Sequence, residues 1–280
     1  MPRSLAAAPP TVAVTIIARD EADRLPGCLA SVAFADEVVV VVDAASTDGT
    51  ERVASDFGAR VVVRTFDGFG PQKNAAAALA SSEWILSVDA DEIVSPALAI
   101  EIRARLRERE RKKPAARPAA YRVPIHLEFL GRELRYGRDT AVKPVRLYER
   151  ERARFNDERV HERVVADGPL DTLDETILHR SYRDLTHYLA KLDRYTTLAA
   201  EEKLVAGRGG TRLLPVRVAW EFFDRAVLRL GFLDGAPGLT FAALSAGNTL
   251  FKYWKLNETR RRKDTVAREA AANAVPYGPA

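Results

Sequence analysis

Cysteine is almost missing from this chain of 280 residues, which has a single one at Cys28. An internal disulfide and a metal site built from cysteines are therefore excluded. The N-terminal stretch MPRSLAAAPPT lacks the continuous apolar segment of a signal peptide. The uncharged run 235–251 contains Pro237 and Asn248, so we do not expect it to span a membrane. These absences favour a cytoplasmic protein in a reducing compartment.

A strong excess of charge of one sign is also missing, because 43 Lys and Arg face 39 Asp and Glu, for a net charge of +4. This mildly basic balance suits a nucleotide, an anionic membrane surface or a nucleic acid. The positive charge gathers near the C-terminus and no nucleic-acid recognition module is present, so nucleic acid is the weakest of these partners. Apolar residues make up 47% of the chain, enough for a substantial core.

Segments of strand and helix character alternate along the first hundred residues. We predict strands at 12–18, 37–42, 60–64 and 84–88, and helices at 22–33, 50–57, 71–80 and 95–112. Alternation at this spacing predicts an α/β fold with a mostly parallel sheet covered by helices on both faces. Ligands of such sheets bind beyond the carboxyl ends of the strands, where Asp43 and Asp89 follow their strands.

The second half of the chain has a different texture. A basic, proline-bearing connector at 111–120 leads into short strands at 121–127 and 145–149, and three helices are predicted after Tyr182, at 184–205, 213–230 and 239–257. The predicted organisation is a disordered N-terminus (1–10), one α/β domain (11–182) with halves 11–100 and 121–182, a helical arm (183–263) and a flexible tail (264–280).

Two carboxylates one residue apart, Asp89 and Asp91, follow the fourth predicted strand. Both can reach one divalent cation across a turn, and Mg²⁺ or Mn²⁺ prefers such oxygen ligands while keeping positions open for phosphates. The alternative is an acidic turn before the helix that Ser95 caps. The position after a buried strand favours the metal site, with Glu92 as a supporting or capping residue.

Three further elements carry polar side chains near the same edge of the sheet. Asp43 can accept hydrogen bonds from a base N–H or a ribose hydroxyl, and Asp20 and Glu21 form a polar patch after the first strand. A loop with two glycines, residues 68–74, opens the third helix, and its Lys73 can bind a phosphate. Taken alone, Lys73 is better explained as an ordinary solvated lysine.

Together these elements resemble the nucleotide-sugar-binding half of inverting glycosyltransferases of family 2, which have the Rossmann-like GT-A fold. The resemblance rests on TIIARDEADRL, VVDAASTDGT, GFGPQKNAA and LSVDADE, in the family's order. It implies that Asp20, Glu21 and Asp43 hold the nucleoside, and that Asp89 and Asp91 hold a divalent metal on the diphosphate. Arg19 departs from the family's pattern, in which Asn or Lys is more usual.

Motifs in the second half resemble the branch of this family that includes the lipopolysaccharide core β-glucosyltransferases. They include Tyr136-Gly137-Arg138, Val160-His161-Glu162 and His179-Arg180-Ser181-Tyr182. The resemblance implies Glu162 as the base that deprotonates the acceptor, His179 as a further metal ligand, and UDP-glucose with a lipid-linked glycan as substrates. A polyprenyl-phosphate sugar transferase and a non-catalytic scaffold of the same fold remain alternatives. His161 is either an orienting or a structural residue, and His179 is either a metal ligand or a structural residue.

Aromatic and basic residues alternate in the helical arm, where Trp220, Phe222 and Phe223 lie among Arg217 and Arg225. Between positions 208 and 264, eleven Lys and Arg face five Asp and Glu. This composition predicts a helix pair in a membrane interface, so we expect peripheral contact with the inner face of a bacterial cytoplasmic membrane. The alternative is a helical appendage packed on the core or on a second subunit.

Overall fold

The protein is described by a computed structural model, which covers residues 8–137, 142–156, 162–207, 210 and 212–273. The chain forms two compact units. The first is Met1–Glu128 with Asp139–Ser181, and the second is Phe129–Arg138 with Tyr182–Ala280.

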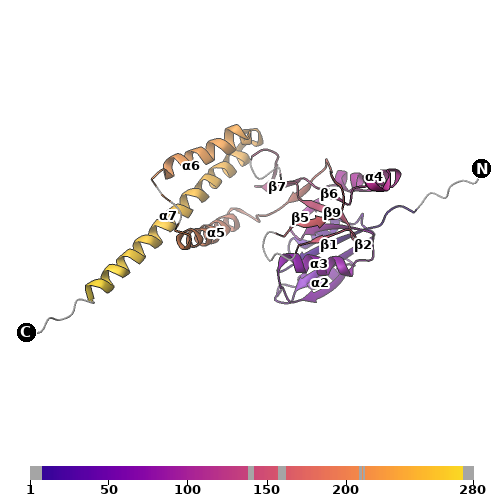
Figure 1. Ribbon diagram of the computed structural model, residues 1–280, viewed down its shortest axis with the longest axis horizontal. Coiled ribbons are helices and arrows are strands. Elements are labelled where there is room, and N and C mark those ends of the chain that lie inside the picture. The colour runs from indigo at the N-terminus through magenta and orange to yellow at the C-terminus, as the bar shows by residue number, and fades with distance from the viewer. Residues whose placement is uncertain (1–7, 138–141, 157–161, 208–209, 211, 274–280) are drawn as a thin grey trace, which may run out of the picture. The chain divides into compact units, whose positions relative to one another are not determined.

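A seven-stranded sheet forms the centre of the first unit (Figure 1), with the strand order β12-β6-β9-β4-β1-β2-β3. Its strands are β1 (Val12–Ala18), β2 (Glu37–Asp43), β3 (Arg60–Arg64), β4 (Trp84–Asp89), β6 (Ala120–Arg122), β9 (Val145–Glu149) and β12 (Leu170–Thr172). Strands β3, β2, β1 and β4 are parallel, whereas β9 is antiparallel to both β4 and β6. The strand order reverses between β1 and β4, which is where ligands of such sheets bind.

Helices cover both faces of this sheet, namely α1 (Leu25–Ser31), α2 (Thr50–Asp56), α3 (Phe69–Leu79) and α4 (Pro96–Arg111). Successive side chains of β1 point to opposite faces. Val12, Val14 and Ile16 therefore pack in a cluster with residues of α1 and α4, while Ala13 packs in a second cluster with residues of α3. Because both faces are buried, the strands are continuous apolar runs, as predicted.

Two smaller sheets complete the first unit. In one, β13 (Ile177–His179) pairs antiparallel with β5 (Glu92–Val94) and parallel with β7 (Ile125–Phe129). This register places His179 directly opposite Glu92, next to the acidic turn after β4. The other sheet joins β10 (Ala153–Phe155) to β11 (Val164–Ala166).

The second unit is mainly helical, as predicted. Its elements are β8 (Arg132–Leu134), α5 (Leu185–Val205), α6 (Leu214–Phe223), a π-helical turn (Asp224–Leu228), the 3₁₀ turn Gly231–Asp234 and α7 (Gly235–Asn273). Helix α6 runs alongside α7 (Figure 1), and buried Ala200, Leu214, Tyr253 and Leu256 form a core between α5, α6 and α7.

Two helix boundaries predicted from the sequence are wrong. The helix predicted at 213–230 ends as an α-helix at Phe223, and the chain turns at Leu230, whose φ of 60° is left-handed. The helix predicted at 239–257 begins at Gly235 and runs to Asn273, into the predicted tail, whereas residues 274–280 lie outside the described residues.

Within the described ranges, no single helix is both long and apolar enough to cross a membrane. One pair of helical segments has the required length and composition together, Leu214–Leu228 and Gly231–Val266, with a bend of 69° between them.

Candidate functional site

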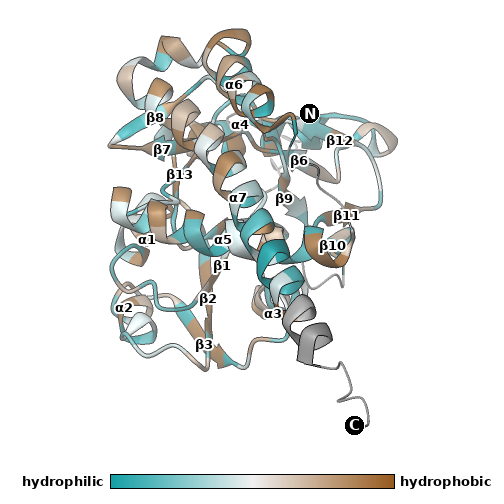
Figure 2. Cartoon of the chain, turned by 90° about the vertical axis from the view of Figure 1, so that its left-hand side faces the viewer, coloured by the Kyte–Doolittle hydropathy of each residue, from teal (hydrophilic) through white to brown (hydrophobic). Residues whose placement is uncertain are grey.

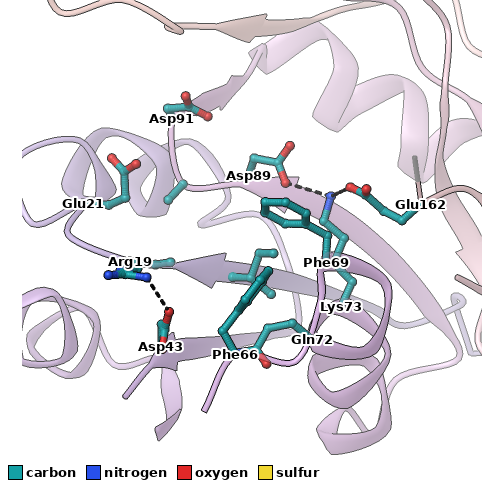
Figure 3. A pocket seen from close by; sticks show the side chains of 13 residues that line it. Arg19, Glu21, Asp43, Phe66, Phe69, Gln72, Lys73, Asp89, Asp91 and Glu162 are labelled. Atoms are coloured by element: carbon teal, nitrogen blue, oxygen red, sulfur yellow. Dashed lines mark hydrogen bonds and ion pairs between the residues drawn. The ribbon is translucent and has the colours of Figure 1, made fainter. Parts of the chain in front are cut away.

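A cavity of about 460 Å³ opens at the carboxyl ends of β1, β2 and β4 (Figure 3), within the size range of small-molecule sites. It lies at the predicted edge of the sheet because the register aligns the ends of the three strands, with Ile17 opposite Asp89 and Ala18 opposite Val42. The residues that line it come from five segments of the first unit: Ile17, Ala18, Arg19, Glu21, Asp43, Phe66, Phe69, Gln72, Lys73, Asp89, Ala90, Asp91 and Glu162.

Lys73 links two of the predicted site residues. Its Nζ lies 3.1 Å from Oδ1 of Asp89 and 3.1 Å from Oε1 of Glu162 (Figure 3). The side chain enters from the first turns of α3, is 5% exposed, and has its ammonium 5.3 Å from the ring centroid of Phe155. An ordinary solvated lysine is therefore excluded. Lys73 and Glu162 meet at one wall of the cavity, although they are 89 positions apart in sequence.

Arg146 forms a second bridge behind the cavity. Its Nη2 donates to Oδ2 of Asp89 at 2.9 Å and to Oε1 of Glu92 at 2.7 Å, and Glu92 is fully buried. Burial opposes ionisation of Asp89, but the charges of Arg146 and Lys73 outweigh it and hold the pKa of this carboxyl far below its usual range. Burial and the neighbouring charge of Asp89 raise the pKa of Glu92 to about 7, against the attraction of Arg146.

Asp91 has different partners from Asp89, although only one residue separates them. Its Oδ2 lies 3.3 Å from Nη1 of Arg24 and 3.3 Å from Nε2 of His179. Burial opposes protonation of His179. The hydrogen bond and the charge of Asp91 outweigh burial and raise the pKa of the imidazole above its usual value, and the negative charges of Glu92 and Asp89 add to this effect. The Asp-Ala-Asp turn thus points its two carboxylates at two separate sets of basic groups.

The end of the cavity at β2 contains Asp43 and Arg19. The Asp43 carboxylate is buried at the end of β2, accepts from the Ala45 backbone N–H at 3.0 Å and lies 3.4 Å from Nη1 of Arg19. Phe66 and Phe69 form an aromatic pair beside it, with ring centroids 5.0 Å apart and both rings partly exposed. An exposed aromatic pair near a buried carboxylate is suited to a planar base.

Glu21 and Asp20, the predicted acidic patch, separate in the structure. Glu21 lines the cavity and holds Arg24 through both carboxylate oxygens, at 2.6 and 2.7 Å. Asp20 is not among the residues that line the cavity, and its Oδ1 accepts from the Thr47 backbone N–H at 2.9 Å. The backbone of Asp20 has a left-handed φ of 53°, and its side chain hydrogen-bonds the loop after β1 to the loop after β2.

The predicted metal ligands are brought together only in part. Among the described residues, no three His, Cys, Asp or Glu side chains surround a common metal position, because Asp89 faces Lys73 and Arg146. Asp91 and His179 do fit such an ion. Two neighbouring ligands of an octahedral ion with bonds of about 2.1 Å lie roughly 3 Å apart, and the two facing atoms are 3.3 Å apart. One carboxylate with phosphate oxygens is a usual way to hold Mg²⁺.

Several functional groups were missed in the sequence analysis. Phe66, Phe69 and Gln72 line the cavity but had no role assigned to them, although Phe69 and Gln72 belong to the glycine-bearing loop 68–74 and Phe66 lies just before it. Arg24 and Arg146 are ion-pair partners whose sequence positions resemble those of surface arginines. His161, the predicted neighbour of the base, lies outside the described residues.

Comparison with known proteins finds similarity to glycosyltransferases. Residues 13–116 match the family model described as Glycosyl transferase family 2. A protein of Rickettsia felis named as a glycosyltransferase is 29% identical over 273 residues, which cover 93% of this chain and 94% of that protein. The Rhizobium meliloti lipopolysaccharide core biosynthesis glycosyltransferase LpsC is 25% identical over 246 residues, covering 82% of this chain and 88% of LpsC.

Solved structures show a more distant likeness. The structure of S. aureus TarS 1–349 in complex with UDP-GlcNAc covers 87% of this chain and 81% of its own, with a TM-score of 0.47 and 16% identity. The family match covers β1 to α4, including four of the five segments that line the cavity.

Proposed function

We propose that this protein, a glycosyltransferase of family 2, transfers glucose from UDP-glucose with inversion to a lipid-linked glycan such as the lipopolysaccharide inner core. One observation carries the proposal most directly. Lys73 joins Glu162 to Asp89 at 3.1 Å each, so a carboxylate able to act as a base lies in the same cavity as the strand-end carboxylates. Transfer with inversion needs this arrangement, because base and leaving group must flank one anomeric carbon.

In this mechanism Glu162 accepts the proton of the acceptor hydroxyl while the hydroxyl oxygen forms a bond to the anomeric carbon. The bond from that carbon to the diphosphate oxygen breaks on the opposite face, and UDP leaves with the electron pair. Asp43 receives the nucleoside, and the ring pair Phe66–Phe69 offers the base a surface to stack on. The Lys73 ammonium lies where it can offset charge on the diphosphate.

The charge of the cavity supports a requirement for a divalent cation. Five of the side chains that line it are carboxylates (Glu21, Asp43, Asp89, Asp91 and Glu162) and two are basic (Arg19 and Lys73). An anionic diphosphate is therefore poorly matched to the side chains alone. Asp91 and His179 would hold Mg²⁺ or Mn²⁺, which supplies positive charge against the departing diphosphate.

The donor, the acceptor and the location of the enzyme rest on resemblance. Motifs of the second half are similar to those of lipopolysaccharide core β-glucosyltransferases, and LpsC is named for lipopolysaccharide core biosynthesis. A lipid-linked acceptor is made at a membrane, so peripheral contact with the inner face of the cytoplasmic membrane is part of the proposal. A polyprenyl-phosphate acceptor would use the same donor site.

The test of the base is Glu162→Gln, assayed as UDP release from UDP-glucose with a core oligosaccharide lipid in detergent. Gln still accepts a hydrogen bond from Lys73 but takes no proton, so kcat falls about 100-fold or more, while UDP affinity by calorimetry stays unchanged. Glu151→Gln, at an exposed turn of the same unit, is the matched control. Retention of more than about a tenth of the wild-type rate would remove Glu162 from the role.

The same assay separates the remaining alternatives. Chelation of divalent cations stops turnover and added Mn²⁺ or Mg²⁺ restores it, whereas full activity in chelator contradicts the metal requirement. Faster turnover with polyprenyl phosphate than with the core lipid would replace the proposed acceptor.

A further inference from the structure

Helix α6 exposes apolar side chains on the side that faces away from its own core. Leu214 and Val218 turn toward Tyr253 and Leu256 of α7. The opposite side carries Val216, Trp220 and Phe223, and Val227 of the π-helical turn continues the row. The spacings are four, three and four residues, and these four residues are 65%, 59%, 43% and 43% exposed. Such spacing places all four on one helical face. Figure 2 shows the prevalence of hydrophobic colouring on α6.

The turn that follows α6 continues this surface. Leu228, Leu230, Phe232 and Leu233 are each 44% to 54% exposed. We call these four residues the tip, and Val216, Trp220, Phe223 and Val227 the apolar face. Trp220 and Phe223 have ring centroids 6.1 Å apart, so they form a single aromatic ridge. Contiguous exposed apolar surface of this kind marks an interaction site rather than ordinary protein surface.

Charge and composition identify the partner as a lipid surface. The segment from 208 to 264 holds eleven Lys and Arg against five Asp and Glu, which suits an anionic bilayer. The bent pair Leu214–Leu228 and Gly231–Val266 also has the apolar character of a membrane segment, an observation independent of side-chain exposure. A soluble protein partner would account for the exposed apolar side chains. It would not require a helix pair with the apolar character of a membrane segment.

The arginine beside the tip indicates how deep the segment lies. The Arg229 side chain is 46% exposed and its Nε is 3.0 Å from Oδ2 of Asp224. A charged pair next to the tip is costly at the centre of a bilayer, but a long arginine side chain can reach the headgroups from the acyl boundary. A shallow position in one leaflet accommodates both groups, and a spanning segment does not.

We propose that the apolar face and the tip insert into one leaflet of an anionic bilayer at the depth of the acyl boundary. This deepens the membrane contact included in the proposed function by assigning the side chains that make it. The two proposals can fail separately. Binding to vesicles that contain no acceptor tests the apolar face and the tip, whereas turnover in detergent tests the transfer of the sugar.

The first experiment is flotation of the full chain with vesicles of phosphatidylglycerol and phosphatidylethanolamine, compared with phosphatidylcholine alone. The wild type floats with the anionic vesicles, and high salt weakens this binding. The double variant Trp220→Glu/Phe223→Glu binds at least about tenfold more weakly, because two buried aromatic groups are lost. Val205→Glu, on α5 of the same unit and 88% exposed, binds like the wild type. Circular dichroism confirms that each variant is folded.

The second experiment measures depth through tryptophan fluorescence. Trp254 is replaced by Phe, so that Trp220 is the one exposed tryptophan and Trp84, 1% exposed, serves as an internal reference. Anionic vesicles shift the Trp220 emission to the blue, and lipids brominated near the headgroup quench it more than lipids brominated near the chain ends.

Four results overturn the proposal. One is absence of wild-type binding to anionic vesicles, and another is binding by the double variant equal to that of Val205→Glu. The third is a wild-type dimer in solution that Trp220→Glu/Phe223→Glu dissociates without changing vesicle binding, which would make the apolar face an interface between two copies. Quenching strongest from the chain ends would contradict the shallow depth.

Discussion

Removal of the Arg146 guanidinium leaves two carboxylates side by side in the interior of the first unit. Arg146→Met keeps most of the side-chain volume but strips Asp89 of one cationic partner and the fully buried Glu92 of its ion pair. Breaking a buried ion pair costs about 3–5 kcal/mol. The lower end applies, because Asp89 keeps Lys73 and because the buried Nε of Arg146 has no hydrogen-bond partner among the residues that the structure describes.

The measurement is urea unfolding followed by Trp84 in a Trp220→Phe/Trp254→Phe background. Trp84 lies in β4 and the other two tryptophans of the chain lie in the second unit, so the signal reports the first unit alone. With a urea dependence of about 2 kcal/mol/M, a loss of about 3 kcal/mol lowers the midpoint by about 1.5 M.

A second substitution tests the physical cause. At about pH 9, where Glu92 is driven to ionise, Glu92→Gln added to Arg146→Met removes the uncompensated charge, and its amide oxygen still accepts the Asp89 backbone N–H, which Glu92 holds at 2.8 Å. We expect recovery of at least about 1 kcal/mol. Arg154→Met, at an exposed position of β10, shifts stability by less than about 0.5 kcal/mol and is the control. The reasoning fails if Arg146→Met behaves like this control, or if Glu92→Gln restores nothing.

Two further predictions concern stability in each unit. The hydrogen bond from Arg103 lowers the pKa of Asp36, so this carboxylate stabilises the fold above its unfolded pKa of about 4 and the stabilisation is lost as the pH falls through the folded value. In urea unfolding at pH 7, Asp36→Asn is therefore less stable than the wild type. The loss is under about 1 kcal/mol, because the Asp36 side chain is 42% exposed. At pH 2 the variant and the wild type are equally stable. In the second unit, Gly238→Ala lowers the thermal midpoint because its Cβ overlaps the carbonyl oxygen of Gly231. Gly247→Ala, which has space, raises that midpoint.

The parallel part of the sheet follows from the sequence because its determinants are local. Continuous runs such as Val38–Val42 predict buried strands, and the residue that ends each run lies at the ligand-binding edge. The sequence therefore places Asp43 and Asp89 correctly at strand ends.

The partners of these carboxylates were beyond sequence reasoning because they depend on non-local pairing. Arg146 reaches Asp89 because β9 inserts antiparallel beside β4, 57 positions away, and a single arginine in an alternating strand gives no sign of this. The extension of α7 to Asn273 was missed for another reason. Its charged end was taken for a solvated tail, but pairs such as Glu258–Arg262, at 2.6 Å, support a solvated helix equally well.

The division of the Asp-Ala-Asp turn has a consequence for its chemistry. Asp89 forms ion pairs with Lys73 and Arg146. Lys73 also contacts Glu162, and Arg146 also contacts the buried Glu92. Asp91 faces Arg24 and His179. Arg24 gives Asp91 a permanent cationic partner, whereas Asp89 has two in Lys73 and Arg146, so under the proposed function an added cation would gain more from Asp91, where the neutral imidazole of His179 would supply a second ligand. The two carboxylates would then not be interchangeable: Asp89 would hold the lysine that contacts the proposed base Glu162, and Asp91 would hold the metal.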